Sequence, residues 1–320
     1  MIMSASSEPV HIILGAGALG RATARALIAD GRPTRLVSRT PRPAPQGATP
    51  VTADLLDPTG LALTMRDAEA VYFCAQPPYH RWSQEFAILQ AAAVQAASNV
   101  GARLISAENL YGYGPVYGPM TEDLPLTPNT RKGAVRAAMH EQLMRAHDAG
   151  QVEVAVARGS DFFGPGVDGS AVGARAFDAL LKGQAVPMLG DLDALHSWTF
   201  VEDFGRALAT LGQDTRALGQ VWHVPNAPPV SARRFFELAG RLAGVPGKVR
   251  RMGRTELAIG GLFVPAAREI VEMMYEFDEP FVVDHGKFAR AFGDLSTPLE
   301  RALAITVEAY RSERDDRAVA

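Results

Sequence analysis

Three glycines near the start of the chain have the spacing that brings a peptide backbone close to a phosphate. Gly15, Gly17 and Gly20 form a GxGxxG pattern directly after a β-branched apolar run, Val10–Leu14, and a helical run, residues 18–30, follows. The first glycine permits a tight turn, the second lets the backbone approach a pyrophosphate, and the third lets helix and strand pack closely. The helix N-terminus then holds the anion. The predicted dinucleotide-binding residues are Gly15, Gly17, Ala18, Leu19 and Gly20.

The end of the second predicted strand, Thr34–Val37, indicates which dinucleotide is bound. An Asp or Glu at this point would hydrogen-bond the ribose hydroxyls of NAD. The sequence has Ser38 and Arg39 instead, and a guanidinium suits the 2′-phosphate of NADP. We therefore expect NADP(H), bound in part by Ser38 and Arg39. The alternative is a surface arginine that happens to follow the strand.

Side chains able to move a proton follow the predicted fourth and fifth strands, residues 70–76 and 102–108. They are Tyr79 and His80 after the fourth strand, and Asn109, Tyr111, Tyr113 and Tyr117 after the fifth. A phenol can give a proton to a substrate oxygen, so Tyr111 is a candidate acid, while Asn109 can hydrogen-bond a carbonyl and Glu108 can act as a base. We expect Tyr79 and Tyr113 to contact substrate. The alternative is that these loop aromatics serve only for packing.

The elements that hold these groups alternate along the chain. Further strands are predicted over residues 48–55, which would bring Asp54 and Leu55 near the adenine, and over 152–160, with helices over 81–100 and 133–149. Repeated strand–helix units favour an α/β fold with a Rossmann-type doubly wound parallel sheet, whose ligands bind at the carboxyl ends of the strands.

After Gly164-Pro165-Gly166 the rhythm changes, and the remaining chain is mostly helical, with one helix expected over residues 256–277. A strand running into a helix is predicted over residues 196–212, and His196 and Trp198 at its start are expected to line the substrate pocket. We predict a Rossmann domain of residues 1–165, to which 197–225 return, and a smaller substrate domain of 166–196 and 226–320. The last residues, 312–320, are expected to fray.

Composition and charge exclude several classes of protein. Apolar residues make up 47% and charged residues 21%, and the net charge of −3 argues against a nucleic-acid or anionic-membrane partner, because such partners need concentrated Lys and Arg. The single cysteine, Cys74, is expected to be a buried strand thiol in a cytoplasmic protein. The N-terminus lacks the regions of a signal peptide. Neither HExxH nor CxxC occurs, so no metal is expected. The GxSxG elbow of serine hydrolases is also absent, which disfavours that class of enzyme.

Four motifs together resemble the extended short-chain dehydrogenase/reductase family, in particular its NAD(P)-dependent epimerase/dehydratase-like members. They are GAGALG, SAENLYGYGP, ARGSDFFGPGV and FVEDFGRAL, and the resemblance runs from Val10 to about Tyr310. It implies a Rossmann domain that carries the cofactor and a C-terminal domain that selects the substrate. Residues that it places beside the cofactor or the substrate are Ala75, Gln76, Pro77, Ser106, Gly159 and Ser160. Gly159 stands where the family's loop usually has proline.

The sequence departs from the family at the acid. Members usually carry Tyr-x-x-x-Lys at the start of the helix after the fifth strand, where the tyrosine moves a proton and the lysine lowers its pKa and holds the ribose. If Glu141 fixes the register, Gly133 stands at the tyrosine position and Ala137 at the lysine position. The family's serine or threonine falls near Ala107, with Ser106 one residue early.

Two basic residues flank these positions on the same helix. Lys132 can reach the nicotinamide ribose from the helix start and is a candidate for both cofactor binding and catalysis. Arg136 lies next to the lysine position but points about 100° away around the helix. Both are replacement candidates for the missing acid; the alternative for each is a solvated helix residue.

The sequence thus predicts an NADP(H)-dependent oxidoreductase that reduces a carbonyl or an activated C=C bond of a small organic substrate without the usual acid. Conjugate reduction needs less from a tyrosine, because hydrogen bonds can stabilise an enolate. One alternative is a non-catalytic NADP(H)-binding sensor, which an apolar plug at the nicotinamide end would favour and polar residues there would disfavour. Another is a sugar-nucleotide epimerase or dehydratase, which would depend on the missing tyrosine.

The helices over residues 81–100 and 133–149 carry broad apolar faces. In the family the equivalent pair often forms a four-helix dimer interface, so we expect a homodimer; the alternative is that these faces only cover the sheet. His140 and His147 lie on one face of the second helix. This spacing is typical of a surface or dimer pattern rather than of a ligand pair.

Overall fold

The computed structural model describes residues 9–253, 256 and 269–319. Its main feature is a parallel seven-stranded sheet with strand order β11-β6-β5-β4-β1-β2-β3. The expected Rossmann-type fold is confirmed. The strands are β1 (Val10–Leu14), β2 (Thr34–Ser38), β3 (Ala48–Thr52), β4 (Ala68–Phe73), β5 (Arg103–Glu108), β6 (Val154–Arg158) and β11 (Gln220–His223).

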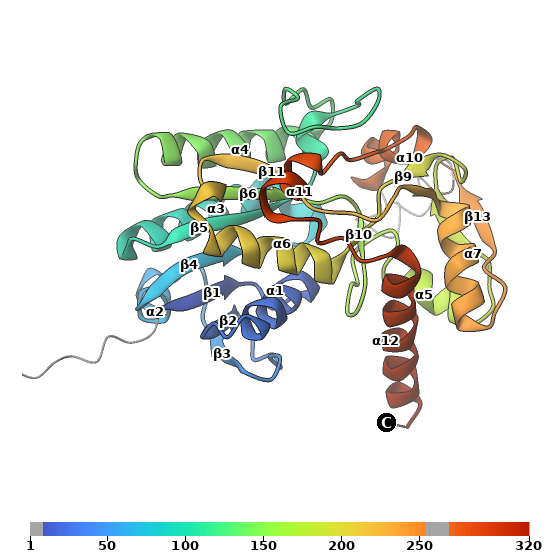
Figure 1. Ribbon diagram of the computed structural model, residues 1–320, viewed down its shortest axis with the longest axis horizontal. Coiled ribbons are helices and arrows are strands. Elements are labelled where there is room, and N and C mark those ends of the chain that lie inside the picture. Colours follow the sequence, from blue (N-terminus) through green and yellow to red (C-terminus); the bar gives the residue numbers. More distant parts are fainter. Residues whose placement is uncertain (1–8, 254–255, 257–268, 320) are drawn as a thin grey trace, which may run out of the picture.

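Helices cover both faces of the sheet, which explains why β1 and β6 are buried along their whole length (Figure 1). The helices α1 (Ala18–Ala29) and α6 (Val201–Gln213) pack together on one face, and α3 (Trp82–Val100) and α4 (Arg131–Asp148) pack together on the other. Alternate strand residues serve the two layers: Ile13 faces α1 and α6, while Ile12 faces α3. A short helix, α2 (Pro58–Thr64), is capped by Asp57, which accepts from Thr59 N.

The C-terminal part has a separate core beside the carboxyl end of the sheet (Figure 1). Its main helices are α5 (Ala174–Leu181), α7 (Ala232–Ala243) and α12 (Leu299–Val319), with the shorter α10 (Tyr275–Asp278) and α11 (Gly286–Phe292). Paired short strands join these helices to the sheet. They are β7 (Phe162–Phe163) with β10 (Thr199–Phe200), β9 (Leu195–His196) with β12 (Val230–Ser231), and β8 (Val186–Leu189) with β13 (Val249–Met252).

Two expectations concern the C-terminal end of the chain. The frayed tail expected over residues 312–320 is wrong, because α12 continues to Val319. Good helix formers extend the helix, and Arg314 Nη1 donates to the carbonyl of Leu181 at 2.9 Å, which holds it against α5. Most of the helix expected over residues 256–277 lies outside the described residues.

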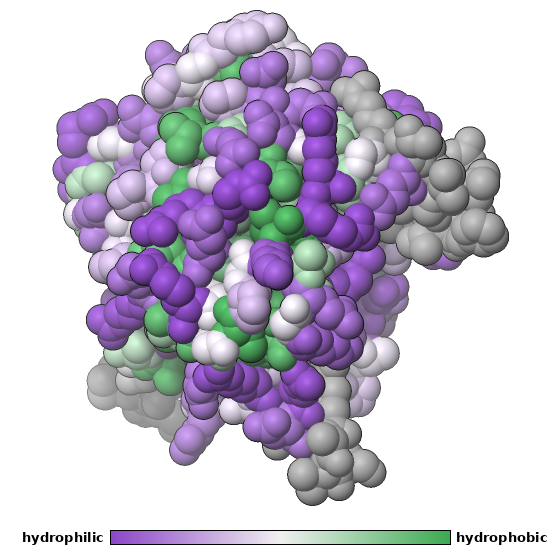
Figure 2. All heavy atoms as spheres, turned by 90° about the vertical axis from the view of Figure 1, so that its right-hand side faces the viewer, coloured by the Kyte–Doolittle hydropathy of each residue, from purple (hydrophilic) through white to green (hydrophobic). Residues whose placement is uncertain are grey.

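The outer face of the C-terminal part is mainly hydrophilic, with hydrophobic side chains showing between the polar ones near its centre (Figure 2). Such a mixture is typical of a protein surface. Among the described helices, none is both long and apolar enough to cross a membrane.

Candidate active site

The glycine loop after β1 leaves open space at the N-terminus of α1. Gly15 has a φ of +118°, and a Cβ there would lie 2.7 Å from the backbone nitrogen of Ala75, in the loop after β4. A Cβ on Gly20 would overlap the carbonyl oxygen of Gly15, whereas one on Gly17 would meet nothing within 4 Å. Gly17 caps α1 without any side-chain hydrogen bond. A phosphate can therefore approach free helix N–H groups here, so the loop fits a dinucleotide.

The neighbouring loops are arranged around this opening. Ala18 and Leu19 are half-buried in the first turn of α1, and Ala75 lies against the glycine loop. Gln76 is exposed, and the carbonyl of the buried Pro77 accepts from Trp82 Nε1 at 3.3 Å.

The end of β2 borders an open hollow of about 330 Å³, lined in part by Ser38, Arg42 and Thr52. Ser38 Oγ donates to the carbonyl of Thr40 at 2.8 Å, and Arg39 is exposed beside it. Arg42 is a second guanidinium at this point that sequence reasoning missed, although it stands only three residues after Arg39.

The two residues expected near the adenine differ in their accessibility. The carboxylate of Asp54 accepts from Leu56 N at 3.0 Å. Leu55 is 5% exposed and belongs to the core between the sheet, α2 and α3. Leu55 is therefore mainly a packing residue.

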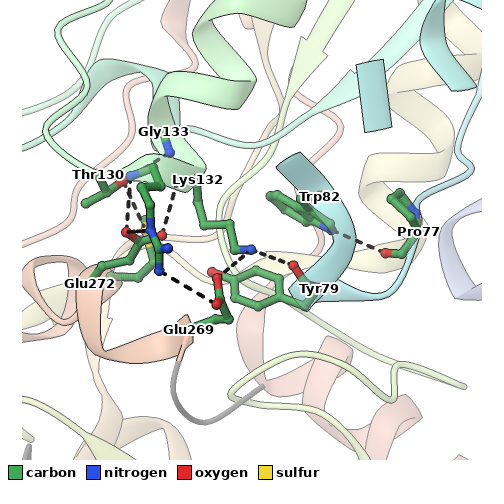
Figure 3. A network of polar contacts seen from close by, with 10 residues as sticks. Pro77, Tyr79, Trp82, Thr130, Lys132, Gly133, Glu269 and Glu272 are labelled. Atoms are coloured by element: carbon green, nitrogen blue, oxygen red, sulfur yellow. Dashed lines mark hydrogen bonds and ion pairs between the residues drawn. The ribbon is translucent and has the colours of Figure 1, made fainter. Parts of the chain in front are cut away.

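Lys132 is buried at the start of α4, contrary to the alternative of a solvated lysine. The residue is 2% exposed, and its Nζ donates to the carbonyl of Tyr79 at 2.6 Å and pairs with Glu269 Oε2 at 2.8 Å (Figure 3). The ammonium also lies 4.7 Å from the centre of the Tyr79 ring. Tyr79 belongs to the 3₁₀ turn η1 (Tyr79–Arg81), which follows β4 at the carboxyl edge of the sheet.

The N-terminus of α4 receives its own carboxylate from the C-terminal part of the chain. Glu272 accepts from the backbone N–H groups of Arg131 and Lys132 at 3.1 and 3.2 Å, and Thr130 Oγ1 accepts from Gly133 N at 3.0 Å (Figure 3). A carboxylate is favourable there because the first helical N–H groups lack partners and carry partial positive charge. Glu272 thus ties the region before α10 to the Rossmann part.

Gly133 has no room for a side chain. A Cβ there would lie 2.6 Å from the carbonyl oxygen of Tyr111 and 2.9 Å from Pro128 Cβ. The positive charges at the start of α4 come from Lys132 and Arg136. Arg136 lies one turn after Lys132 and is 4% exposed. Its Nη2 donates to the carbonyl of Ala107 at 3.2 Å, and its guanidinium lies 4.7 Å from the ring centre of Phe86. Two buried cations on one helix face therefore reach toward the ends of β4 and β5.

Glu108 belongs to a buried ion cluster rather than to a set of bases. Its Oε2 lies 3.1 Å from Arg158 Nε and 3.4 Å from His140 Nδ1. Burial alone would raise the pKa of Glu108, but His140, Arg158 and Arg136 outweigh it and lower that pKa to about 2. The expectation of a surface pattern for His140 and His147 is wrong, because His140 turns inward to Glu108 and His147 Nδ1 accepts from Val154 N at 3.2 Å.

Phenols and carboxyls meet beside Lys132. Tyr111, in the 3₁₀ turn η2 (Tyr111–Tyr113), has its pKa raised well above the ordinary value by burial and by Glu276 of α10. Burial and Glu276 also raise the pKa of Tyr79. Asp161, which follows β6, pairs with His196 Nε2 at 3.0 Å and contributes to both shifts.

Sequence reasoning missed four carboxyls of this region: Asp161, Glu269, Glu272 and Glu276. Three of them come from a segment far along the chain from α4, so no local spacing connects them to it. A signal exists for Glu276, which interrupts an apolar helical face formed by Met273 and Phe277.

Other predicted residues take supporting places. Tyr113 is fully buried, with its hydroxyl 2.9 Å from His223 Nε2, so it does not join Tyr79 and Tyr111. Asn109 Oδ1 accepts from Tyr111 N at 3.3 Å and thereby shapes η2. Ser106 is buried within β5. Trp198 is also buried; its Nε1 donates to the carbonyl of Val230, and its ring stacks on His196.

Gly159 and Ser160 begin the loop that carries Asp161. The N–H of Gly159 donates to the carbonyl of Glu108 at 3.0 Å, and a Cβ there would lie 2.5 Å from the ring of Phe204. Proline has no N–H to donate, so a proline at position 159 could not make this hydrogen bond. Ser160 is 5% exposed, and its Oγ has no hydrogen-bond partner within the described part of the chain.

Comparison with known proteins adds to this geometry. Residues 11–224 match the model of the NAD dependent epimerase/dehydratase family. The chain belongs to this family. The resemblance drawn from its motifs is thereby confirmed.

The sequence is similar to that of a curated relative, a dTDP-glucose 4,6-dehydratase of Streptomyces griseus, with 26% identity over 212 residues. The match covers 66% of this chain and spans 58% of the length of that relative. Two solved structures share the fold. One is a dTDP-glucose 4,6-dehydratase double mutant of Streptomyces venezuelae with NAD and DAU bound, at a TM-score of 0.76, 20% identity and coverage of 95% and 98% of the two chains. The other is the UDP-glucose 4-epimerase of Thermotoga maritima with UDP-glucose. Its TM-score is 0.77, its sequence identity is 17%, and the match covers 95% of this chain and 99% of that chain.

Two features of the described residues concern other chemistries. No group of three or more His, Cys, Asp or Glu placed to hold a metal ion occurs among them. Cys74 follows β4 and is half-buried; burial raises its pKa to about 12, although the Thr23 hydroxyl partly offsets this. The thiol is therefore a poor nucleophile at neutral pH.

Proposed function

We propose that this chain is an NADP(H)-dependent oxidoreductase that reduces a carbonyl or an activated C=C bond of a small organic substrate. The observation that carries the proposal is the buried ammonium of Lys132 beside the loop after β4. An ammonium has three N–H donors, and Tyr79 and Glu269 use two of them among the described residues. Within the described part of the chain no third partner occurs, and we assign the remaining N–H to a substrate oxygen.

The chain's residues hold the dinucleotide at two points in this proposal. The glycine loop and the N-terminus of α1 bind the pyrophosphate, and Arg39 and Arg42 with Ser38 bind the 2′-phosphate. The bound nucleotide supplies a hydride to the substrate. Ala75, Pro77 and Gly159 border the nicotinamide half.

Lys132 provides electrostatic stabilisation where negative charge develops on the substrate oxygen. A cation fixed in a water-poor site stabilises such charge more strongly than one in solvent, and it needs no reorientation during the reaction. Arg136 keeps the end of β5 in place through the carbonyl of Ala107. Tyr79, Ser160 and His196 contact the substrate on the side of the C-terminal part.

Fluorescence titration with NADPH and NADH tests the cofactor assignment. We expect tighter binding of NADPH, and we expect Arg39→Asp to reverse the preference, because a carboxylate repels the 2′-phosphate and accepts from ribose hydroxyls. Arg145→Asp, on the exposed side of α4, is the matched charge-change control and should leave both affinities unchanged. Binding of neither nucleotide would overturn the proposal.

Oxidation of NADPH in the presence of diacetyl or cyclohexenone tests the reaction. We expect Lys132→Met to bind NADPH and to lose turnover of both probes. Equal turnover by the wild type and Lys132→Met would show that the ammonium has no part in the chemistry.

A second candidate is a sugar-nucleotide dehydratase, which the 26% identity to the Streptomyces griseus dehydratase favours. Incubation with dTDP-glucose and NAD, followed by mass spectrometry for loss of water, tests it. A non-catalytic sensor is disfavoured by the charged groups gathered around Lys132, since a sensor would not need them.

We also propose a homodimer through α3 and α4, where Ile88 is 56% exposed. Light scattering after size-exclusion chromatography measures the molar mass in solution and tests this proposal. The mass of a monomer at micromolar concentration would overturn it.

A further inference from the structure

Glu276 brings a deeply buried carboxyl from the C-terminal part to the region beside Lys132. It lies on α10 and is 1% exposed, and its Oε1 has no hydrogen-bond partner among the described residues. The hydroxyl of Tyr275 beside it is likewise without a partner in that part of the chain. A buried polar atom without a partner costs free energy and needs an explanation, of which a catalytic role is one.

The surroundings of Glu276 contain no cation left over to pair with it in the described structure. Lys132 is paired with Glu269, and His196 is paired with Asp161. Burial and the negative charge of Asp161 raise the pKa of Glu276 well above its ordinary value. Both effects favour the protonated, uncharged form of the Glu276 carboxyl over the carboxylate.

The phenols around Glu276 are weaker acids than an ordinary tyrosine. Burial and the nearby carboxyls raise the pKa of Tyr79, Tyr111 and Tyr275 above that of an ordinary tyrosine. The ammonium of Lys132 lies over the Tyr79 ring, and Glu276 contributes to the raised pKa of the same tyrosine. Glu272, four residues before Glu276, accepts from the backbone N–H of Lys132 at 3.2 Å, so the segment that carries both carboxyls packs against the start of α4.

We propose, resting on the oxidoreductase function above, that Glu276 gives the proton that the family's tyrosine usually supplies. As a hydride bonds to the carbonyl carbon, the π electron pair of the C=O bond moves to the oxygen. The O–H bond of Glu276 breaks, and its proton bonds to that oxygen to give the alcohol. Glu276 is left as a carboxylate and regains a proton from water before the next turnover, while Lys132 keeps its charge.

Infrared spectroscopy of Glu276→Gln tests the protonation state without any turnover. We expect the wild type at neutral pH to show a protonated-carboxyl stretching band that shifts in D₂O, and Glu276→Gln to lose this band. Glu279→Gln removes an exposed carboxyl from the same segment and should keep it. An unchanged band in Glu276→Gln would overturn the proposal.

Steady-state reduction of diacetyl by NADPH tests the donor role. A positioned general acid contributes roughly a hundredfold or more to the rate, so kcat of Glu276→Gln should fall by at least about that factor with NADPH affinity unchanged. The wild-type kcat should decline as pH rises through the pKa of Glu276, and the variant should lack this limb. Glu276→Asp keeps an acid and should retain part of the rate and the band.

The outcomes separate the two proposals. A wild-type kcat in Glu276→Gln would overturn the donor role alone. Failure of the wild type to bind NADPH would overturn the oxidoreductase function and the donor role with it, even if the infrared band is present.

Discussion

Glu108 and Arg158 stand directly opposite each other on β5 and β6, and their buried side chains meet at 3.1 Å between Oε2 and Nε. Removing one member of such a pair leaves a buried charge without compensation. We expect Glu108→Gln to lower the free energy of unfolding by about 3–5 kcal/mol, measured by urea denaturation at pH 7. Glu141→Gln, which removes an exposed partner of Arg145, should cost less than about 1 kcal/mol. Similar losses in the two variants would contradict this view of the cluster.

The same pair predicts how stability depends on acid. The pKa of Glu108 is lowered from 4.5 to about 2, so its contribution is present above pH 4.5 and is lost as pH falls toward 2. A shift of this size corresponds to roughly 3 kcal/mol. The difference in urea midpoint between the wild type and Glu108→Gln should therefore shrink over this interval. A constant difference would sink the prediction.

The raised pKa of Glu276 predicts the opposite dependence of stability on pH. Its pKa in the folded protein is raised above its ordinary value, so its favourable contribution is complete at low pH and is lost as pH rises through the raised pKa. We expect the melting temperature of the wild type to fall, as pH rises above 4.5 toward the raised pKa, by more than that of Glu276→Gln. Glu279→Gln should follow the wild type at every pH, and parallel curves for all three proteins would argue against a buried neutral acid.

Gly17 and Gly20 should respond differently to alanine. At Gly20 the methyl group would overlap the carbonyl oxygen of Gly15, whereas at Gly17 it would project into open space. Gly20→Ala should unfold at a distinctly lower temperature. Gly17→Ala should fold normally but bind NADPH more weakly, because its methyl group occupies the approach of the pyrophosphate. Calorimetry and nucleotide titration of both variants check this, and unchanged binding by Gly17→Ala would count against the proposed phosphate site.

Cys74 is the one thiol of the chain, so a thiol reagent reports on it alone. Because burial raises its pKa to about 12, little thiolate exists at neutral pH and labelling of the folded protein should be slow. Labelling should become fast in denaturant. Rapid labelling of the native protein would show that the loop after β4 opens.

The parts of the molecule that follow local rules could be predicted from the sequence. The glycine loop and the buried strands depend on neighbouring residues and on strand periodicity, and the structure has them where expected. The environment of Lys132 could not be predicted, because its partner Glu269 and the cap Glu272 lie far along the chain. The inward turn of His140 was missed for the same reason: its helical spacing says nothing of the carboxylate at the end of β5.

The close contact of Gly133 with η2 also limits which substitutions this chain can accept in later evolution. Even a Cβ at position 133 would press against the Tyr111 carbonyl and Pro128. A change of Gly133 to tyrosine alone would therefore disrupt the loop that must hold the new phenol. Descendants of this protein can acquire such a phenol only if the loop ahead of α4 is rebuilt at the same time. Any change of chemistry by single steps must therefore proceed through the other side chains already gathered around Lys132.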